Sequence, residues 1–218
     1  MKLTKYEHSC VVLEKDGKSL VIDPGELSSS FVVPENCVGV IVTHEHFDHL
    51  DQSKLQTIID ADSSVQILAN QAVVALLNEK EKERAVVVEA GKIIKVGEFT
   101  LEFVGGMHEQ VRPELSACEN TGVIIDGVFY HPGDAHFVPD EQIKWLAVPL
   151  NAPWSRVSET CDFVKLIRPS HAVAIHDGLL SEAGVKTYQA HVSAACENIG
   201  TQLHILKSGE QIELDNEN

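Results

Sequence analysis

Residues 38–51, VGVIVTHEHFDHLD, join an apolar run to a dense cluster of polar side chains. Residues 38–42 are apolar and mostly β-branched, which is typical of a buried strand. Three histidines and two aspartates follow within the next nine positions. Imidazole and carboxylate groups at the end of a buried strand must be solvated, paired or bound to a ligand. The stretch therefore places a candidate metal site at the end of a core strand.

The spacing of this cluster favours two adjacent metal ions. His44 and His46 are two residues apart, so in extended backbone both rings point to the same side and can share one ion. Asp48 and His49 follow as the chain turns, and a second ion nearby would suit them better. Neutral imidazole and carboxylate are suitable ligands for zinc, manganese or iron. The alternative, a solvated loop with chance histidines, rarely produces so dense a pattern.

Four residues of one loop cannot complete two coordination shells, and three further candidates lie elsewhere in the chain. His108, Asp134 and His176 each follow a predicted strand, and each has a glycine close by in the sequence. Glycine lets the backbone bend beside a crowded site. Taken singly, each of the three would more often be a surface or capping residue. Together with the first motif they form a candidate ligand set.

The pattern of apolar residues predicts many short strands separated by a few helices. Helices are expected over 51–61, 70–83, 158–168 and 186–199, with Asp51 or Ser53 capping the first, and with Ser158 capping the third and Pro169 ending it. Tight hairpins are expected at KDGK (15–18) and at Asp126–Gly127. Two sets of strands with helices between them favour two packed sheets covered by helices, in one domain spanning 1–218. The two halves have a similar succession of predicted strands and helices, which is weak evidence for an internal duplication.

Composition excludes several classes of protein. The formal net charge of −16 disfavours nucleic acid and anionic membranes as partners. No apolar run approaches the ~20 residues of a membrane span, and no signal peptide is evident, so we expect a cytoplasmic protein. The five scattered cysteines are expected to be reduced thiols. Bound divalent ions would offset some negative charge, so a small anionic substrate stays open. The sequence does not determine the oligomeric state, and a homo-oligomer is included among the partners considered.

The ordered series His44-x-His46-x-Asp48-His49, His108, Gly133-Asp134 and His176 resembles the metallo-β-lactamase superfamily of metal-dependent hydrolases. The resemblance covers nearly the whole chain. It implies an α+β fold, the αββα four-layer sandwich with two mixed sheets between helices. It also implies that His44, His46 and His108 bind one divalent ion, that Asp48, His49 and His176 bind a second, and that Asp134 bridges both. Asp23, in VIDPG, would support the ligands from behind; its alternative is an aspartate that starts a turn.

Within the superfamily, the segments YEHSCVVLE, VIDPG and TGVIID…FYHPGD are most similar to the ascorbate-6-phosphate lactonase-like branch. That branch has a histidine near the site that matches His8, which could otherwise be a surface residue between two strands. The chain departs from the branch after Gly133-Asp134, where Ala135 and His136 stand in place of the usual threonine. The loop NAPWSR (151–156) matches no known substrate preference. Its Arg156, near Trp154, is a weak candidate for holding an anionic substrate.

The resemblance implies a hydrolase that uses a water activated by two divalent metal ions, zinc or manganese and also iron. Asp134 would orient the nucleophile, and the leaving group would take a proton from His8, His136 or a metal-bound water. The expected substrate is a small ester, lactone or phosphorylated metabolite. Two alternatives remain, a small-nucleotide phosphodiesterase and a non-catalytic protein that binds metal or ligand. The redox di-iron branch is set aside because His46 stands where that branch carries glutamate. The nuclease branches are set aside because they have a large inserted domain.

Overall fold

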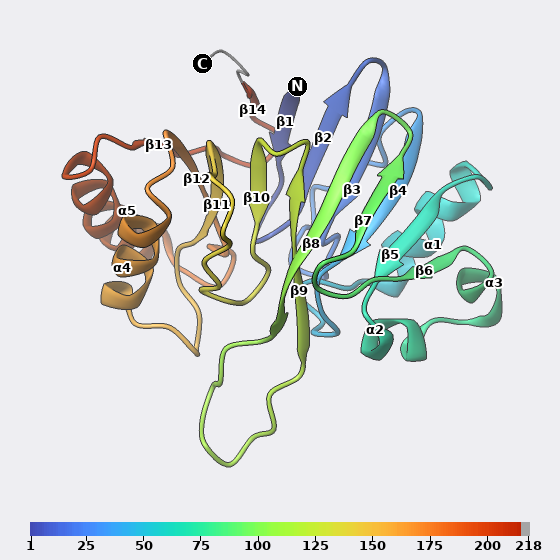
Figure 1. Ribbon diagram of the computed structural model, residues 1–218, viewed down its shortest axis with the longest axis horizontal. Coiled ribbons are helices and arrows are strands. Elements are labelled where there is room, and N and C mark those ends of the chain that lie inside the picture. The colour runs from blue at the N-terminus through green and yellow to red at the C-terminus, as the bar shows by residue number, and fades with distance from the viewer. Residues whose placement is uncertain (215–218) are drawn as a thin grey trace.

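Two seven-stranded sheets pack face to face, and helices cover their outer faces (Figure 1). The computed structural model describes residues 1–214. The first sheet has the order β14-β1-β2-β3-β4-β5-β6, formed by Gln211–Glu213, Lys2–Lys5, Val11–Lys15, Lys18–Ile22, Cys37–Val42, Gln66–Ala69 and Ala85–Val87. The second has the order β13-β12-β11-β10-β9-β8-β7, formed by Gln202–His204, His171–Ile175, Trp145–Pro149, Phe129–His131, Glu119–Ile125, Phe99–Met107 and Ile93–Val96.

The two sheets are built by the same series of strand pairings. In the first sheet, the pairs from β14 to β3 are antiparallel and the pairs from β3 to β6 are parallel. In the second, the pairs from β7 to β10 are antiparallel and those from β10 to β13 are parallel. The similar rhythm of the two halves in the sequence thus has a counterpart in the topology. β14, the last strand of the chain, takes the place in the first sheet that β7 takes in the second.

The core has three apolar layers, as a four-layer sandwich requires. The central layer lies between the sheets and combines residues of both, including Leu13, Ile41, Phe103 and Trp145. Helix α1 (Gln52–Ala61) packs on the outer face of the first sheet through Leu55, Ile58 and Ile59. Helices α4 (Val157–Ile167) and α5 (Glu182–Glu197) cover the second sheet through residues such as Phe163 and Val192. The predicted αββα sandwich is confirmed.

Local signals in the sequence explain several element boundaries. Of the two predicted caps, Asp51 is the one that caps α1, by accepting the backbone N–H groups of Ser53 and Lys54. The hairpin turn between β2 and β3 has Asp16 and Gly17 at positive φ, as a two-residue type I′ turn requires. Asp126 and Gly127 have the same conformation between β9 and β10.

Some predicted boundaries are wrong. The helix expected over 70–83 is two short helices, α2 (Gln71–Leu76) and α3 (Glu79–Lys82), because Asn78 caps a new helix together with Glu81. Helix α4 starts before Ser158: Arg156 is its N-cap, and the Glu159 carboxylate accepts the backbone N–H of Arg156. Helix α5 starts at Glu182 rather than at 186.

Two expectations from composition can be compared with the structure. All five cysteines are free thiols, and Cys10, Cys37 and Cys196 are buried. Over residues 1–214, no helix combines the length and the apolar character needed to cross a membrane.

Candidate metal centre

The predicted ligands come together at the edge of the sandwich where strands of both sheets end. His44, His46, Asp48 and His49 follow β4 of the first sheet. His108 follows β8 of the second sheet. Asp134 comes after β10 and His176 directly after β12. Because strands end side by side at a sheet edge, residues far apart in the sequence can converge there.

Asp134 lies at the centre of this group. Its Oδ1 is 3.0 Å from His49 Nε2, and its Oδ2 is 3.1 Å from His176 Nε2. The same Oδ2 is 3.4 Å from His108 Nε2 and 4.0 Å from His44 Nε2. The carboxylate is buried and faces imidazoles from both halves of the predicted ligand set. This position fits the bridging role that we expected for Asp134.

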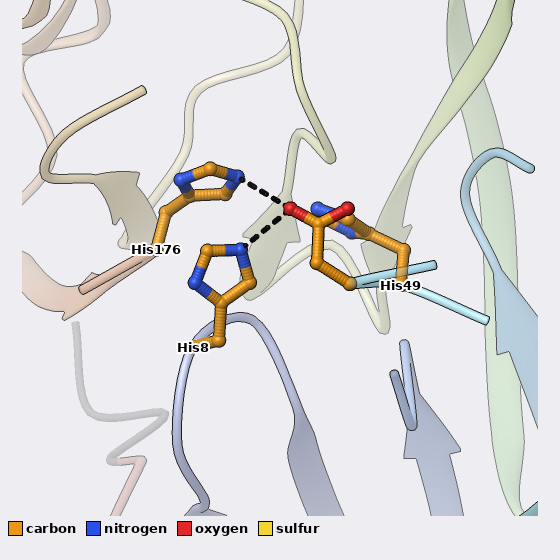
Figure 2. A group of neighbouring side chains, drawn as sticks. His8, His49 and His176 are labelled. Carbon is orange, nitrogen blue, oxygen red and sulfur yellow. Dashed lines mark hydrogen bonds and ion pairs between the residues drawn. The ribbon is translucent and has the colours of Figure 1, made fainter. Parts of the chain in front are cut away.

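The ligand atoms form two main groups, each with its atoms within 4.8 Å of one another. One group contains His44, His46 and His108. The other contains Asp48, His49 and His176, with His8 in addition (Figure 2). A third combination of His44, His49 and Asp134 connects the two. The two groups contain the same residues as the two sets that the resemblance implies, with His8 added to the second.

Hydrogen bonds decide which ring nitrogen faces the centre. In four of the histidines, Nδ1 faces an acceptor outside the centre, so Nδ1–H can donate to it and Nε2 points into the centre. These acceptors are Thr43 Oγ1 for His44, Asp23 Oδ2 for His49, the Glu109 carbonyl for His108 and the Asn151 carbonyl for His176. Ligating histidines are commonly held by such bonds.

His46 has the opposite orientation. Its Nδ1 faces the centre, 3.1 Å from His44 Nε2. Its Nε2 points outward, 3.8 Å from the sulfur of Cys118. The Cys118 sulfur is therefore the neighbour of the outward nitrogen. Nothing in the sequence indicated this role for a cysteine between His108 and Asp134.

Several buried polar atoms of this group have no hydrogen-bond partner among the described residues. They are Nε2 of His49, Nε2 of His108 and Oδ1 of Asp134. The 3.0 Å approach of His49 Nε2 to Asp134 Oδ1 lacks hydrogen-bond geometry. An unpaired buried polar atom costs free energy, and native proteins rarely leave several together. A divalent cation with nitrogen and oxygen ligands would satisfy all three atoms. The residues therefore fit the metals that the resemblance implies.

Asp23 supports the centre from behind. It is fully buried at the end of β3 and has a left-handed φ of 50°. Its Oδ1 accepts the Thr43 backbone N–H, and its Oδ2 accepts both the Thr43 hydroxyl and His49 Nδ1–H, at 2.8, 2.8 and 2.7 Å. Since the Thr43 hydroxyl donates to Asp23, its oxygen can accept from His44 Nδ1. One carboxylate thus orients two candidate ligands.

His8 lies close to the centre but differs from the other histidines. It is buried in the β1–β2 loop, and its Nδ1 accepts the backbone N–H of Gly178 at 3.2 Å. The neutral ring must then carry its proton on Nε2, which donates to Asp48 Oδ2 at 3.0 Å. Burial lowers the pKa of His8 to about 4, against the opposing effect of Asp48. His8 therefore holds Asp48 as a neutral donor.

The charged groups of the centre shift one another's pKa values. Burial opposes the protonated form of His49, but Asp134 and Asp23 raise its pKa well above the usual range. Burial would raise the pKa of Asp134, but the neighbouring His49 and His176 hold it well below its usual range. Burial would also raise the pKa of Asp48, but the hydrogen bond from His8 lowers it to about 2. Asp134 and Asp48 are therefore ionised at neutral pH, as cation ligands must be.

His136 is not brought to the ligands. Its ring stacks on Phe163, with the ring centres 5.0 Å apart, and meets Trp154 edge-on at 5.1 Å. Burial lowers its pKa. Trp154 lies next to Asp134, because its indole N–H donates to Asp134 Oδ2 at 2.8 Å. Arg156, the weak candidate for an anion, is exposed at the N-cap of α4.

Two glycines allow the backbone of the centre to pack closely. A Cβ on Gly25 would lie 1.9 Å from the backbone oxygen of Asp48. A Cβ on Gly133 would lie 2.2 Å from Asn120 Oδ1, the atom that accepts the Asp134 backbone N–H. Gly133 also has a positive φ of 62°. A side chain at position 133 would therefore clash with Asn120, which explains why the residue before Asp134 is glycine.

Comparison with known proteins places this geometry in a family. Residues 2–176 match the family model described as the β-lactamase superfamily domain. The chain is 33% identical to Protein Rv0786c of Mycobacterium tuberculosis, over 83% of this chain and 86% of that protein. It is 27% identical to a UPF0173 metal-dependent hydrolase of Aeropyrum pernix, with 98% of each chain covered.

A solved structure has the same fold. A metallo hydrolase from the archaeon Ignicoccus hospitalis superposes with a TM-score of 0.73, at 20% identity and with 97% of each chain covered. The family model and the relatives point to the same family, and the converging histidines and aspartates fit it. The chain therefore belongs to the metallo-β-lactamase superfamily of metal-dependent hydrolases.

Proposed function

We propose that this protein hydrolyses a small ester or lactone at a centre of two divalent metal ions, zinc or manganese. The observation that carries the proposal is the position of Asp134, whose two carboxylate oxygens face imidazoles of both ligand groups. Its Oδ1 and the Nε2 atoms of His49 and His108 are buried without hydrogen bonds in the described structure. Such a set is suited to two neighbouring cations.

The proposed ligands follow the two groups of atoms. His44, His46 and His108 would hold one ion, Asp48, His49 and His176 the other, and Asp134 both. When bound, such ions supply Lewis-acid chemistry, which activates water and stabilises negative charge on the substrate oxygen.

The remaining residues have orienting roles. Asp134 fixes the position of the attacking oxygen by accepting a hydrogen bond, while Trp154 N–H fixes the carboxylate itself at 2.8 Å. His8 Nε2–H fixes Asp48. Because the His8 proton is already donated to Asp48, we assign His8 to orientation rather than to protonation of the leaving group. His136 is not part of the ligand groups and its ring packs against Trp154 and Phe163, so we assign it no role in protonating the leaving group.

The test is turnover by protein purified metal-free and reloaded with Zn²⁺ or Mn²⁺. We expect hydrolysis of p-nitrophenyl acetate and of simple lactones, with about two metal ions per chain. His46→Ala should lose metal from the first group, and Asp134→Ala should abolish turnover. Less than one bound ion per chain, or metal content unaffected by His46→Ala, would refute the proposal.

The same screen separates the alternatives. Turnover of bis-p-nitrophenyl phosphate but of no ester or lactone would favour a phosphodiesterase, and turnover of phosphorylated lactones alone would favour the ascorbate-6-phosphate lactonase-like branch. Loaded protein that hydrolyses none of these would favour a non-catalytic metal-binding member. We further propose a single domain and a cytoplasmic location, consistent with the free thiols. Light scattering would determine whether the protein is a homo-oligomer.

A further inference from the structure

The loops that carry the candidate ligands also carry exposed apolar side chains. Large apolar residues are normally buried, and a group of exposed ones around a site marks a binding surface. We call this group the apolar rim; it consists of Phe47, Met107, Val111, Leu115, Phe137 and Leu179. Their exposed fractions are 55, 56, 41, 44, 43 and 53%.

Chain connectivity places the rim around the metal centre. Phe47 lies between His46 and Asp48, and Met107 directly precedes His108. Phe137 and Leu179 lie three residues after Asp134 and His176, so their Cα atoms are within about 10 Å of those ligands. Asp134 and His176 are themselves in contact at 3.1 Å. Four separate loops therefore bring an apolar side chain to the same edge of the sandwich.

Further contacts tie the rim residues to the site. The Phe137 side chain lies 3.7 Å from the position of a Cβ on Gly105, so Phe137 packs against the end of β8, near Met107. Gly178, which precedes Leu179, packs on the ring of His8. Val111 and Leu115 lie on the long β8–β9 loop, which projects from the bottom of the molecule in Figure 1 and closes where His108 N–H donates to the Cys118 carbonyl.

The charges of the β8–β9 loop and beside His46 do not favour an anion. Between residues 107 and 119 there are three carboxylates, Glu109, Glu114 and Glu119, and a single basic residue, Arg112. Glu45 stands beside His46. Recognition of a phosphate or carboxylate group requires pairing cations, arginine above all. Ligand-bearing loops with exposed apolar side chains and excess carboxylates instead suit an uncharged, hydrophobic ligand.

From these observations we infer that the substrates are uncharged esters or lactones with an apolar acyl chain, and that the apolar rim binds this chain while the metal centre holds the ester carbonyl. This inference rests on the proposed function and narrows it. The reaction is ordinary hydrolysis: water adds to the carbonyl carbon, the bond to the alcohol oxygen breaks, and that oxygen takes up a proton.

The test compares p-nitrophenyl acetate, butyrate and hexanoate, each below its aggregation concentration, on metal-loaded protein. Burial of a methylene group increases binding by up to about fourfold. We expect kcat/KM to rise at least about tenfold from acetate to hexanoate. Phe137→Ser and Leu179→Ser should lower the hexanoate-to-acetate ratio at least about threefold. The matched control is Leu166→Ser, an exposed leucine of α4 away from the ligand loops, which should leave the ratio unchanged.

A binding measurement gives a second readout that does not need turnover. Titration with hexanamide, an uncharged analogue, should quench tryptophan fluorescence in a saturable manner, because Trp154 lies beside Asp134. Acetamide should not, and Phe137→Ser should weaken hexanamide binding at least about threefold.

The outcomes separate this inference from the proposed function. If the protein hydrolyses p-nitrophenyl acetate in a metal-dependent manner but kcat/KM does not change with acyl chain length, the rim inference is overturned and the hydrolase proposal is kept. Hexanamide binding that Phe137→Ser weakens, without turnover of any ester, would support the rim and contradict the hydrolase. If the protein is a dimer that Phe137→Ser converts to a monomer, and the hexanoate-to-acetate ratio of kcat/KM does not change, then a second copy covers the rim. That result would overturn the inference.

Discussion

Single hydrogen bonds decide which atom each histidine presents to the metal centre. Asp23 alone holds His49 directly and His44 through the Thr43 hydroxyl. His8 has the reverse arrangement, because the Gly178 N–H occupies its Nδ1. The chemistry of the centre therefore depends on residues that would not touch the metals.

We expect Asp23→Asn to lower metal affinity by about 10- to 100-fold while the fold is kept, which is the usual effect of losing a partner behind a ligand. An amide can no longer accept all three hydrogen bonds that reach Asp23. Calorimetric titration with Zn²⁺ measures the change. Asp162→Asn, at an exposed aspartate of α4, is the control. Equal affinities of Asp23→Asn and wild type would contradict the role assigned to Asp23.

Gly25→Ala should destabilise the protein by about 1–3 kcal/mol, because the new methyl group would overlap the Asp48 backbone oxygen. The comparison is Gly184→Ala in α5, where the new methyl group would first meet the flexible end of Leu180 at 3.2 Å. That substitution should be neutral or stabilising. Urea unfolding at pH 7 measures both. Similar free energies of unfolding for the two variants would contradict the steric argument.

The sequence predicted which residues lie together at the candidate site, because each is a chemically distinctive residue at the end of a strand. It did not predict the contacts of Trp154 or Cys118. These depend on how the loops after β11 and β8 fold back over the centre, and no periodic pattern encodes that. His136 shows the opposite failure: it is close to Asp134 in sequence, yet its ring turns away to stack on Phe163.

At the scale of elements, caps and strand ends position the site. Helix α1 starts three residues after His49 because Asp51, its N-cap, accepts the backbone N–H groups of its first turn. The Asp51 backbone N–H donates in turn to the Pro24 carbonyl, next to Gly25. The cap thus joins the helix to the loop that carries four candidate ligands.

We expect Asp51→Ala to cost about 1 kcal/mol of stability at pH 7. Burial would raise the pKa of Asp51, but hydrogen bonds from Lys54 and Ser53 lower it to about 2. Since the folded-state pKa lies below the unfolded value of about 3.9, the ionic part of this stability is complete above about pH 4 and is lost as the pH falls towards 2. Urea unfolding of wild type and variant at pH 7 and pH 3 tests this. A larger difference at pH 3 would contradict it.

The elements themselves were predicted more reliably than their ends. The buried strand β4, for example, is a continuous apolar run, and the predicted range 38–42 differs from its observed bounds by one residue. The error at 70–83 arose because the apolar spacing continues across Leu77, whereas the capping box at Asn78 and Glu81 starts a new helix. Local capping chemistry prevailed there over periodicity.

At the scale of the whole molecule, the central core combines apolar residues of both sheets. We therefore expect one cooperative unfolding transition, as a single domain requires. Circular dichroism and tryptophan fluorescence should give the same midpoint, the latter through Trp145 and Trp154, both from the second half of the chain. Two separate midpoints would contradict the single domain.

Because the candidate ligands come from both sheets, bound metal ions would connect the two sheets and stabilise the folded protein. At a free metal concentration of about 100 times Kd, each ion that binds the folded state alone adds about 2.7 kcal/mol. For a chain of this size that corresponds to a Tm higher by about 5–10 °C. Calorimetry with Zn²⁺ and with a chelator measures the difference. The shift should be smaller in His46→Ala and unchanged in His204→Gln, a histidine of β13 outside the ligand groups. A Tm unaffected by chelation would contradict a linking role.

The place of β14 has a consequence for how the chain could be reconnected. The first sheet repeats the strand pairings of the second only if β14 is counted ahead of β1. Met1 and Leu214 already lie together, because the Leu214 N–H donates to the Met1 carbonyl at 2.7 Å. A circular permutant opened between β13 and β14, with the old ends joined, would have two consecutive seven-strand units in sequence order. The native chain and this permutant would then be two different connections of the same two seven-strand units, and we expect both to form the same two sheets.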